Sequence, residues 1–394
     1  MMRKLHDNIA LAAIESLKAV LQENKRTSRV VQKMIATHPK WGARDRKLLY
    51  AIVFDCLRWR RLFAHCIQTP METTTPGQLL TIWCHKNDSL WTDALPLTLS
   101  DIPQERSAVV EASYPDWLFE LGQKELPDYW GKEYPALNQQ AAVSIRTNRL
   151  RTHPQKLKEE LASRYQIKSK IIPDAPDALQ LTQGRKLDKN ALFLKGYFEI
   201  QDAHSQKVAP FTKLTPGMNV IDLCAGAGGK SLQLAALMRN KGSLRAYDIE
   251  ANKLKELQRR ARRAGAKIIQ TEILKQGATL PENENWADVV LVDAPCSGLG
   301  TLKRNPELKW RLTEATLKSL QQTQTALLQQ AAPWIKHNGV LVYATCSILP
   351  SENQQIVNTF LNSHEGFQLE EEQSYYAHQS SFDGFYMARM KKNS

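Results

Sequence analysis

The stretch NVIDLCAGAGGKSLQLAALM (219–238) decides the fold class. Its first five residues are an apolar run that predicts a strand, a glycine-rich turn follows, and 231–238 predicts a helix. Outward from it, strands are expected at 243–248, 288–293 and 339–345, and helices at 251–265 and 313–335. This alternation predicts an α/β, Rossmann-like domain, in which helices cover both faces of a mostly parallel sheet.

The turn after the first strand, DLCAGAGGKS (222–231), has the composition of a nucleotide-binding loop. Gly226, Gly228 and Gly229 allow a tight turn and let a ligand approach the backbone closely. Asp248 ends the next strand, where a carboxylate can accept hydrogen bonds from both hydroxyls of a ribose. The loop follows neither GxGxxG nor GxxxxGK[ST], which weakens the case for NAD and excludes a phosphate loop. A dinucleotide, S-adenosylmethionine and a plain turn without a ligand remain the alternatives.

Two cysteines directly follow predicted strands. Cys296 lies in DAPCSGLG (293–300) and Cys346 in ATCS (344–347). Ligands of open α/β sheets bind beyond the carboxyl ends of the strands, so we expect both thiols, Asp293 and the glycine loop to meet in one cleft. Two buried bystander cysteines are the alternative.

A thiol in such a cleft suits methylation of cytosine at carbon 5, which is not nucleophilic by itself. A thiolate that adds to carbon 6 turns carbon 5 into a nucleophile, and this carbon then takes the methyl group from S-adenosylmethionine. A free thiol has a pKa of about 8.5, so the nucleophile needs help to ionise. Asp293 is expected to hold the amino and ring-nitrogen edge of the base, as a protonated carboxyl if its pKa is raised. On chemical grounds either cysteine suits the attack.

The remainder of the chain predicts two further domains and a polyanionic partner. Residues 1–140 form an expected all-α domain, with helices near 9–21 and 45–63; 141–207 form a small α+β, RRM-like subdomain; and 208–394 form the catalytic domain. The formal net charge is +13, and basic residues concentrate in 1–63 and 253–267. Such a distribution favours binding to nucleic acid over a scattered positive surface.

The motifs resemble the Sun/RsmB family of S-adenosylmethionine-dependent RNA 5-methylcytosine methyltransferases. The glycine loop, both cysteine motifs, KRNPELKW (303–310) and DGFYMARM (383–390) carry the resemblance across roughly 141–390. The helices around GARDRKLLYAIVFDCLRWR (42–60) resemble the NusB-like RNA-binding domain of bacterial members.

The resemblance implies roles for individual residues. Cys346 would attack the cytosine, and Cys296 would assist product release. The cofactor would be held by Cys224, Ala225, Gly226, Ala227, Gly228, Gly229, Lys230, Asp248, Glu272 and Asp293. The loop departs from the family's Ala-Pro-Gly-Gly but keeps its glycines, and Glu272 replaces the usual aspartate on the adenine side. The implied substrate is small-subunit (16S) rRNA.

Basic residues near the cleft, Lys303, Arg304 and Lys309, are expected to hold the RNA backbone, unless they only form a solvated loop. The sequence contains no CxxC pair, so no metal site is predicted. No apolar run approaches the ~20 residues of a membrane helix. The N-terminus does not resemble a signal peptide, so a cytoplasmic location is expected. A monomer is expected of a modular RNA enzyme. The alternatives are a methyltransferase for tRNA or another nucleic acid, a non-catalytic NusB-like assembly factor, and a NAD oxidoreductase.

Overall fold

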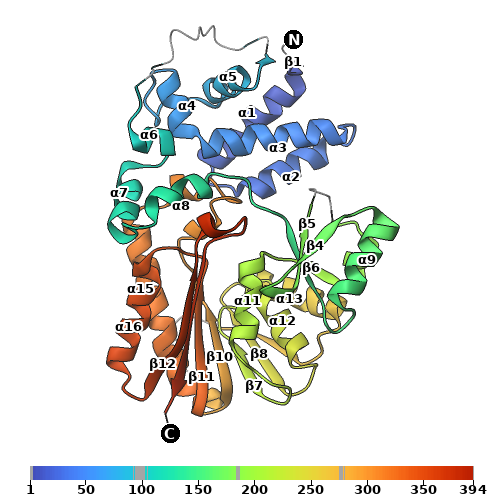
Figure 1. Ribbon diagram of the computed structural model, residues 1–394, viewed down its shortest axis with the longest axis vertical. Helices are drawn as coiled ribbons and strands as arrows, with labels where there is room; N and C mark the ends of the chain where they lie inside the picture. Colours follow the sequence, from blue (N-terminus) through green and yellow to red (C-terminus); the bar gives the residue numbers. More distant parts are fainter. Residues whose placement is uncertain are drawn as a thin grey trace. The chain divides into compact units, whose positions relative to one another are not determined.

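The computed structural model describes residues 3–91, 93, 103, 105–182, 187–274, 278 and 280–393. It divides into two compact units (Figure 1). The first consists of Met1–Gln139 together with Thr301–Leu312, and the second of Gln140–Gly300 with Thr313–Ser394. The second unit contains the predicted cleft.

A seven-stranded sheet forms the centre of the second unit, in the order β12-β13-β11-β10-β7-β8-β9. Its strands are β7 (Asn219–Asp222), β8 (Ser243–Asp248), β9 (Ile269–Ile273), β10 (Ala287–Asp293), β11 (Ile335–Thr345), β12 (Phe367–Tyr375) and β13 (Phe385–Lys392). The pairs from β9 to β11 are parallel, whereas β13 is antiparallel to both β11 and β12. Because β7, β10 and β11 are neighbours, the loops that follow them emerge side by side.

Helices cover both faces of this sheet (Figure 1). Along β10, Val289 and Leu291 face one side, where they pack with α11 (Ala203–Phe211), α12 (Gly229–Leu237) and α13 (Ala251–Ala264). Val290 and Val292 face the other side, toward α15 (Glu314–Ala331) and α16 (Gln354–Ser363). The near-continuous apolar strands follow from burial on both faces.

A smaller antiparallel sheet precedes the large one in the chain, in the order β4-β5-β3-β6. It comprises β3 (Ser144–Thr147), β4 (Ser169–Ile172), β5 (Ala175–Leu181) and β6 (Phe198–Ile200), with α9 (Pro154–Tyr165) and the short α10 (Ala191–Leu194). Its core includes Ile145, Leu157 and Phe198. This small α+β subdomain belongs to the same compact unit as the large sheet.

The first unit is mainly helical. It contains α1 (Asp7–Leu21), α2 (Thr27–Thr37), α3 (Ala43–Arg58), α4 (Arg60–Cys66), α5 (Pro76–Lys86), α6 (Ala108–Ala112), α7 (Asp116–Glu125) and α8 (Trp130–Leu137), besides a two-residue pair of β1 (Arg3–Lys4) with β2 (Ser89–Leu90). The predicted helix at 45–63 is divided at Trp59, whose backbone leaves the helical conformation.

Residues 301–312, which the sequence placed with the catalytic part, pack with the first unit. The segment carries α14 (Leu308–Arg311). The Trp310 indole donates to the Leu57 carbonyl at 2.6 Å, and Thr27 N–H donates to the Glu307 carboxylate at 3.2 Å. The second unit is therefore discontinuous in sequence.

The predicted α/β class with a preceding α+β piece is confirmed, and the strand at 243–248 has the expected bounds. The predicted helix 313–335 was too long, because it ends at Ala331, two residues before Pro333, and β11 begins at Ile335. The antiparallel strands β12 and β13 were not predicted. None of the described helices is long and apolar enough to cross a membrane.

Candidate active site

The glycine-rich loop between β7 and α12 is tied to the neighbouring strand β8. Ala225 N–H donates to the Tyr247 carbonyl at 2.8 Å, and Gly226 N–H donates to Asp248 Oδ2 at 2.8 Å. The other oxygen of Asp248 accepts from Glu250 N–H. Each carboxylate oxygen has a second lone pair, so Asp248 keeps acceptor capacity for a ribose.

The three glycines of the loop have different tasks. Gly226 and Gly228 have φ of +54° and +86°, in the region that favours glycine. A Cβ at Gly228 would lie 2.6 Å from Leu257 Cγ, so this glycine lets α12 and α13 pack closely. A Cβ at Gly226 or Gly229 would meet nothing within 4 Å, which leaves space beside the loop for a ligand.

Two exposed apolar side chains flank Asp248, and the sequence analysis missed them. Ile249 follows it directly and is 70% exposed, whereas Ile273 is 53% exposed at the end of β9. Ile273 pairs with Asp248 in the sheet. Large exposed aliphatic side chains beside a ribose-binding acid are suited to cover the ring of a bound nucleoside. The sequence pattern does not distinguish Ile249 and Ile273 from core residues, because an apolar residue at the end of a strand is usually buried.

Residues of the small α+β subdomain hold the glycine loop through its backbone carbonyls. The buried Arg146 of β3 donates to the Gly229 carbonyl and to Gln201 Oε1, each at 2.5 Å. Burial lowers the pKa of Arg146 to about 10. Arg260 donates to the Ala227 carbonyl at 2.7 Å and is paired at 2.9 Å with Glu199, a buried residue of β6. Two loop carbonyls are thus held by cations that the subdomain positions.

Asp222, the last residue of β7, is fully buried behind the loop. It accepts a hydrogen bond of 2.6 Å from Ser231 Oγ. Burial raises the pKa of Asp222 to about 7; the hydrogen bond opposes the rise, and the nearby Asp293 adds to it. The carboxyl therefore anchors the start of α12 and carries a charge that depends on pH near neutrality.

The two predicted thiols meet beyond the ends of β10 and β11. Cys296 Sγ and Cys346 Sγ are 3.4 Å apart, and both residues are half-buried. The hydrogen bond with Cys346, followed by burial, raises the pKa of Cys296 well above its usual range. Gly300 connects the two loops through its backbone, because its N–H donates to the Cys346 carbonyl at 2.9 Å.

Lys230 and Asp293 form an ion pair of 2.6 Å between the glycine loop and the Cys296 loop. The Lys230 ammonium also lies 5.1 Å from the centre of the Phe385 ring. The pair therefore links the two loops at the carboxyl ends of β7 and β10. The sequence analysis named both residues as cofactor ligands but had no means of pairing them.

The remaining predicted residues are less closely associated with this cleft. Cys224 is half-buried against the apolar cluster on the α15 and α16 face, and burial raises the pKa of its thiol. Glu272 is exposed on β9, opposite Tyr247. Within the described residues, no group of three or more His, Cys, Asp or Glu side chains could hold a metal ion.

Two of the expected RNA contacts need correction. Lys309 has 0% exposure; its ammonium donates to the Arg58 carbonyl and to Asn138 Oδ1, each at 2.9 Å, and lies 4.3 Å from the Tyr114 ring centre. Lys303 is also buried. Both lysines lie inside the first unit, since segment 301–312 belongs to that unit, so they do not fit a contact with RNA phosphates. Arg304 is half-buried.

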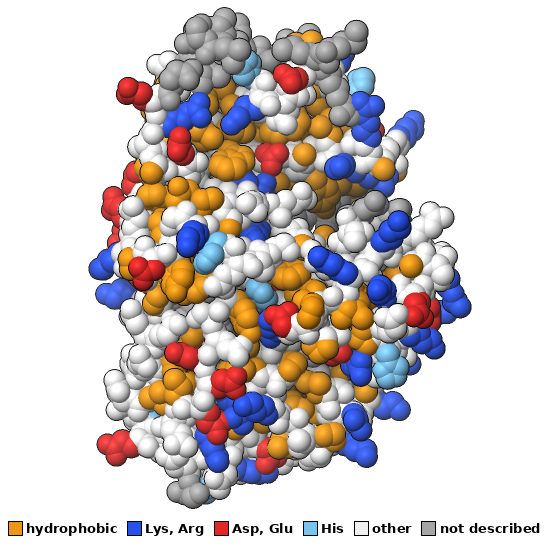
Figure 2. Space-filling model, in the orientation of Figure 1, with side chains coloured by type: hydrophobic (Ala, Val, Ile, Leu, Met, Phe, Trp, Pro, Cys, Tyr) orange, Lys and Arg blue, Asp and Glu red, His pale blue; other side chains and the backbone are white. Residues whose placement is uncertain are grey.

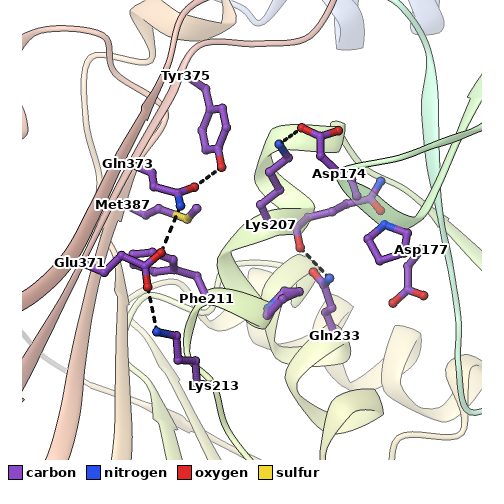
Figure 3. A pocket seen from close by; sticks show the side chains of 14 residues that line it. Asp174, Asp177, Lys207, Phe211, Lys213, Gln233, Glu371, Gln373, Tyr375 and Met387 are labelled. Carbon is purple, nitrogen blue, oxygen red and sulfur yellow. Dashed lines mark hydrogen bonds and ion pairs between the residues drawn. The ribbon is translucent and has the colours of Figure 1, made fainter.

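A separate pocket of about 300 Å³ lies on the α11 side of the sheet (Figure 3). In Figure 3, Gln373 and Tyr375 of β12 face Lys207 and Asp174 across it. Its charges are paired: Lys207 binds Asp174, Lys213 binds Glu371 at 2.8 Å, and Asp177 pairs with Arg149 outside the pocket at 3.7 Å. None of the predicted site residues lines this pocket.

Comparisons with known proteins agree with this geometry. The family described as "16S rRNA methyltransferase RsmB/F" matches residues 211–391, and its "ferredoxin-like domain" matches 114–188. A "Probable ribosomal RNA small subunit methyltransferase B" from Synechocystis is 33% identical over 319 residues, which cover 74% of this chain and 70% of the relative.

Solved structures extend the likeness to the whole chain. The crystal structure of PH0851 is 25% identical, with a TM-score of 0.86 and complete coverage of both chains. NSun6 from Pyrococcus horikoshii, crystallised with the S-adenosylmethionine analogue SFG, is 21% identical. Its TM-score is 0.64, over 72% of this chain and 99% of NSun6, and at that identity it shows the fold alone.

Proposed function

Since the chain belongs to the RsmB/F family of 16S rRNA methyltransferases, which use S-adenosylmethionine, we propose that it methylates carbon 5 of a cytosine in small-subunit rRNA through a covalent bond to Cys346. One observation carries the proposal: two thiols lie 3.4 Å apart beside a glycine-rich loop, at the carboxyl ends of adjacent strands. A pure binding protein has no use for this pair, and the loop lacks the GxGxxG pattern of a dinucleotide oxidoreductase.

The residues of the loop suit S-adenosylmethionine. The space beside Gly226 and Gly229 admits the ligand close to the backbone, Asp248 offers acceptors to the ribose, and Ile249 offers an apolar surface to the adenine. Glu272 would lie on the adenine side and Asp293 near the methionine part. When bound, the cofactor supplies an electrophilic methyl group.

Cys346 forms the covalent bond in this mechanism. Its thiolate adds to carbon 6 of the cytosine, and the electrons of the 5,6 double bond make carbon 5 nucleophilic. After carbon 5 has taken the methyl group, it loses its proton to solvent. The electrons of that C–H bond re-form the 5,6 double bond, the bond between sulfur and carbon 6 breaks, and Cys346 departs as a thiolate. Asp293 accepts a hydrogen bond from the amino group of the base and so orients the ring.

The contact between the two thiols supports a joint role for them. Because the pKa of Cys296 is raised, Cys296 stays a neutral thiol at physiological pH and is a poor nucleophile. From 3.4 Å, its S–H can donate a hydrogen bond to the departing thiolate of Cys346. Such a donation supports our assignment of product release to Cys296.

RNA is the partner that the charge distribution favours. The formal net charge is +13, and basic residues concentrate in 1–63 and 253–267. Figure 2 shows Lys and Arg side chains over one face of the molecule, with Asp and Glu side chains among them. We assign RNA binding to the helical first unit and to the small α+β subdomain, with Arg304 as the remaining candidate of the three predicted cations. A monomer acting in the cytoplasm is part of the same proposal.

The test compares Cys296→Ala, Cys346→Ala and the double variant. Each is incubated with S-adenosylmethionine and either protein-free small-subunit rRNA or tRNA, and then run on a denaturing gel. A covalent protein–rRNA band with Cys296→Ala alone is expected, because attack proceeds while release is blocked. The double variant should give no band.

Other outcomes contradict the proposal in specific ways. A band with Cys346→Ala alone would reverse the two roles. A band only with tRNA would change the substrate, and the absence of methyl transfer and of any band would remove the cytosine chemistry.

A further inference from the structure

A fully buried carboxylate, Glu352, connects the two cysteine loops. It lies just after β11 and has 0% exposure. Glu352 Oε2 accepts hydrogen bonds of 2.5 Å from both Ser297 Oγ and Ser347 Oγ. These serines directly follow Cys296 and Cys346 in the chain. One side chain therefore contacts the neighbour of each thiol.

The other oxygen of Glu352 completes the connection. Oε1 accepts from Ser297 N–H at 2.8 Å and from Gln324 Nε2 at 3.0 Å. Gln324 comes from α15 and also donates to the Pro295 carbonyl at 3.0 Å. A carboxylate has about four acceptor positions, so these donors use all of them.

Burial of the Glu352 carboxylate costs more free energy than burial of a neutral side chain of the same size. Among the ion pairs of the described residues, none involves Glu352, so neutral donors alone compensate the burial of its charge. Burying a carboxylate carries a large desolvation penalty, which a neutral side chain of the same shape would avoid. A requirement specific to this place accounts for an acid here.

We propose that Glu352 is a positioning residue that holds Cys296 and Cys346 at their working separation by binding the serine beside each of them. The inference rests on the proposed function, because the separation matters only if both thiols act on one base. The loops arise from different strands, β10 and β11, and their sulfur atoms touch without a covalent link. A shift of either serine would carry its cysteine with it.

The charge of Glu352 adds an electrostatic consequence. It is one of the causes that raise the pKa of Cys296, after the contact with Cys346 and burial. A buried negative charge beside the thiols opposes a second negative charge on Cys296. Glu352 thereby helps to keep Cys296 as the neutral partner of a thiolate at Cys346.

The central variant is Glu352→Gln, which keeps the shape and removes the charge. Ser347→Ala and Ser297→Ala each remove one serine hydroxyl that binds Glu352, while the charge of Glu352 stays. Glu365→Gln makes the same chemical change as Glu352→Gln at an exposed site. Methyl transfer to rRNA gives kcat and KM. The pH dependence of alkylation by iodoacetamide, followed separately for each cysteine peptide, reports on the thiols without any RNA.

We expect Glu352→Gln to lower kcat about 100-fold, the effect of a displacement of roughly 1 Å at the reacting atoms, with little change in KM for RNA. The alkylation midpoint of Cys296 should move to lower pH, because a negative charge has been removed. Ser347→Ala should lower kcat without moving that midpoint. Its effect should not be additive with that of Glu352→Gln, because both substitutions alter the same contact between residue 352 and Ser347. Glu365→Gln should behave as wild type.

Wild-type kcat in Glu352→Gln with an unmoved Cys296 midpoint would overturn the inference, as would full additivity of Glu352→Gln and Ser347→Ala. If Glu352→Gln does not fold, the two serine variants test the same hydrogen bonds, and wild-type kcat in both would overturn the inference. If the wild-type protein methylates no RNA, the proposed function fails, and the alkylation midpoints still decide whether Glu352 controls the thiols.

Discussion

Replacing Gly300 with alanine tests how closely the two cysteine loops must be held. A Cβ at Gly300 would lie 2.2 Å from the Gly384 carbonyl oxygen and 2.8 Å from that of Cys346, whereas ordinary contact begins at 3.4 Å. These oxygens must therefore retreat by about 1 Å and about 0.6 Å. The Cys346 carbonyl accepts a hydrogen bond of 2.9 Å from Gly300 N–H, and Gly384 N–H donates to the Gly300 carbonyl at 2.8 Å, so the Cys346 loop cannot move away without losing its bond to Gly300.

From this geometry we expect two effects of Gly300→Ala. Overpacking costs about 1–3 kcal/mol of stability, which lowers the melting temperature by roughly 2–12 °C in a domain of this size. Displacement of the Cys346 backbone should lower kcat about 10- to 100-fold, because misplacement on this scale disrupts the alignment of reacting groups.

The assay is methyl transfer to protein-free rRNA together with a thermal melt. Gly366→Ala is the matched control, since a Cβ there meets nothing within 4 Å and the glycine has no positive φ. Wild-type kcat in Gly300→Ala, with a melting temperature equal to that of the control, would refute the reasoning.

Three further predictions concern the supports of the site. Arg146→Met should weaken S-adenosylmethionine binding about tenfold in calorimetry, because a charged hydrogen bond to the Gly229 carbonyl is lost; an unchanged affinity in the folded variant would contradict this. Asp222 has a pKa of about 7 in the folded protein and about 3.9 in the unfolded chain. Its favourable contribution to the free energy of unfolding is therefore present in full below pH 4 and is lost as the pH rises through 7. In thermal melts from pH 5 to 8, Asp222→Asn should therefore gain stability relative to wild type, on the order of a few kcal/mol. Equal dependence of the melting temperature on pH in the two proteins would contradict this prediction. Burial lowers the pKa of Lys309 well below its usual range, so the folded state binds fewer protons, and stability from this group rises as pH approaches about 10.4. Lys309→Met should abolish that rise between pH 7.5 and 10, and an unchanged rise would show that Lys309 is not its source.

The residues changed in these predictions hold the three loops of the proposed site in place. The glycine loop is held by Arg146 and Arg260, and the two thiol loops are held by Glu352 and Gly300. Each support is a hydrogen bond to a backbone carbonyl or to a serine beside a reacting group. Their loss should therefore change affinity or kcat more than it changes the fold.

Much of this protein was determined by the sequence itself. Apolar runs of strand length alternate with helical periodicity, which is a local property, and so the α/β class and the strand 243–248 could be predicted. The glycine loop, Cys296 and Cys346 each occupy the end of a predicted strand. Because parallel strands end at one edge of a sheet, their convergence also followed from the sequence.

Other features were decided only by the tertiary structure. KRNPELKW (303–310) has the charge of an RNA-binding loop, yet its chain packs inside the helical unit, where Lys309 donates to groups of Arg58 and Asn138. Glu352 meets Ser297 across 55 residues of sequence. Such contacts depend on which distant segments pack together, and packing between distant segments leaves no periodic pattern in the sequence. The sequence therefore predicted which groups perform the proposed chemistry, and the tertiary structure decided what holds them in place.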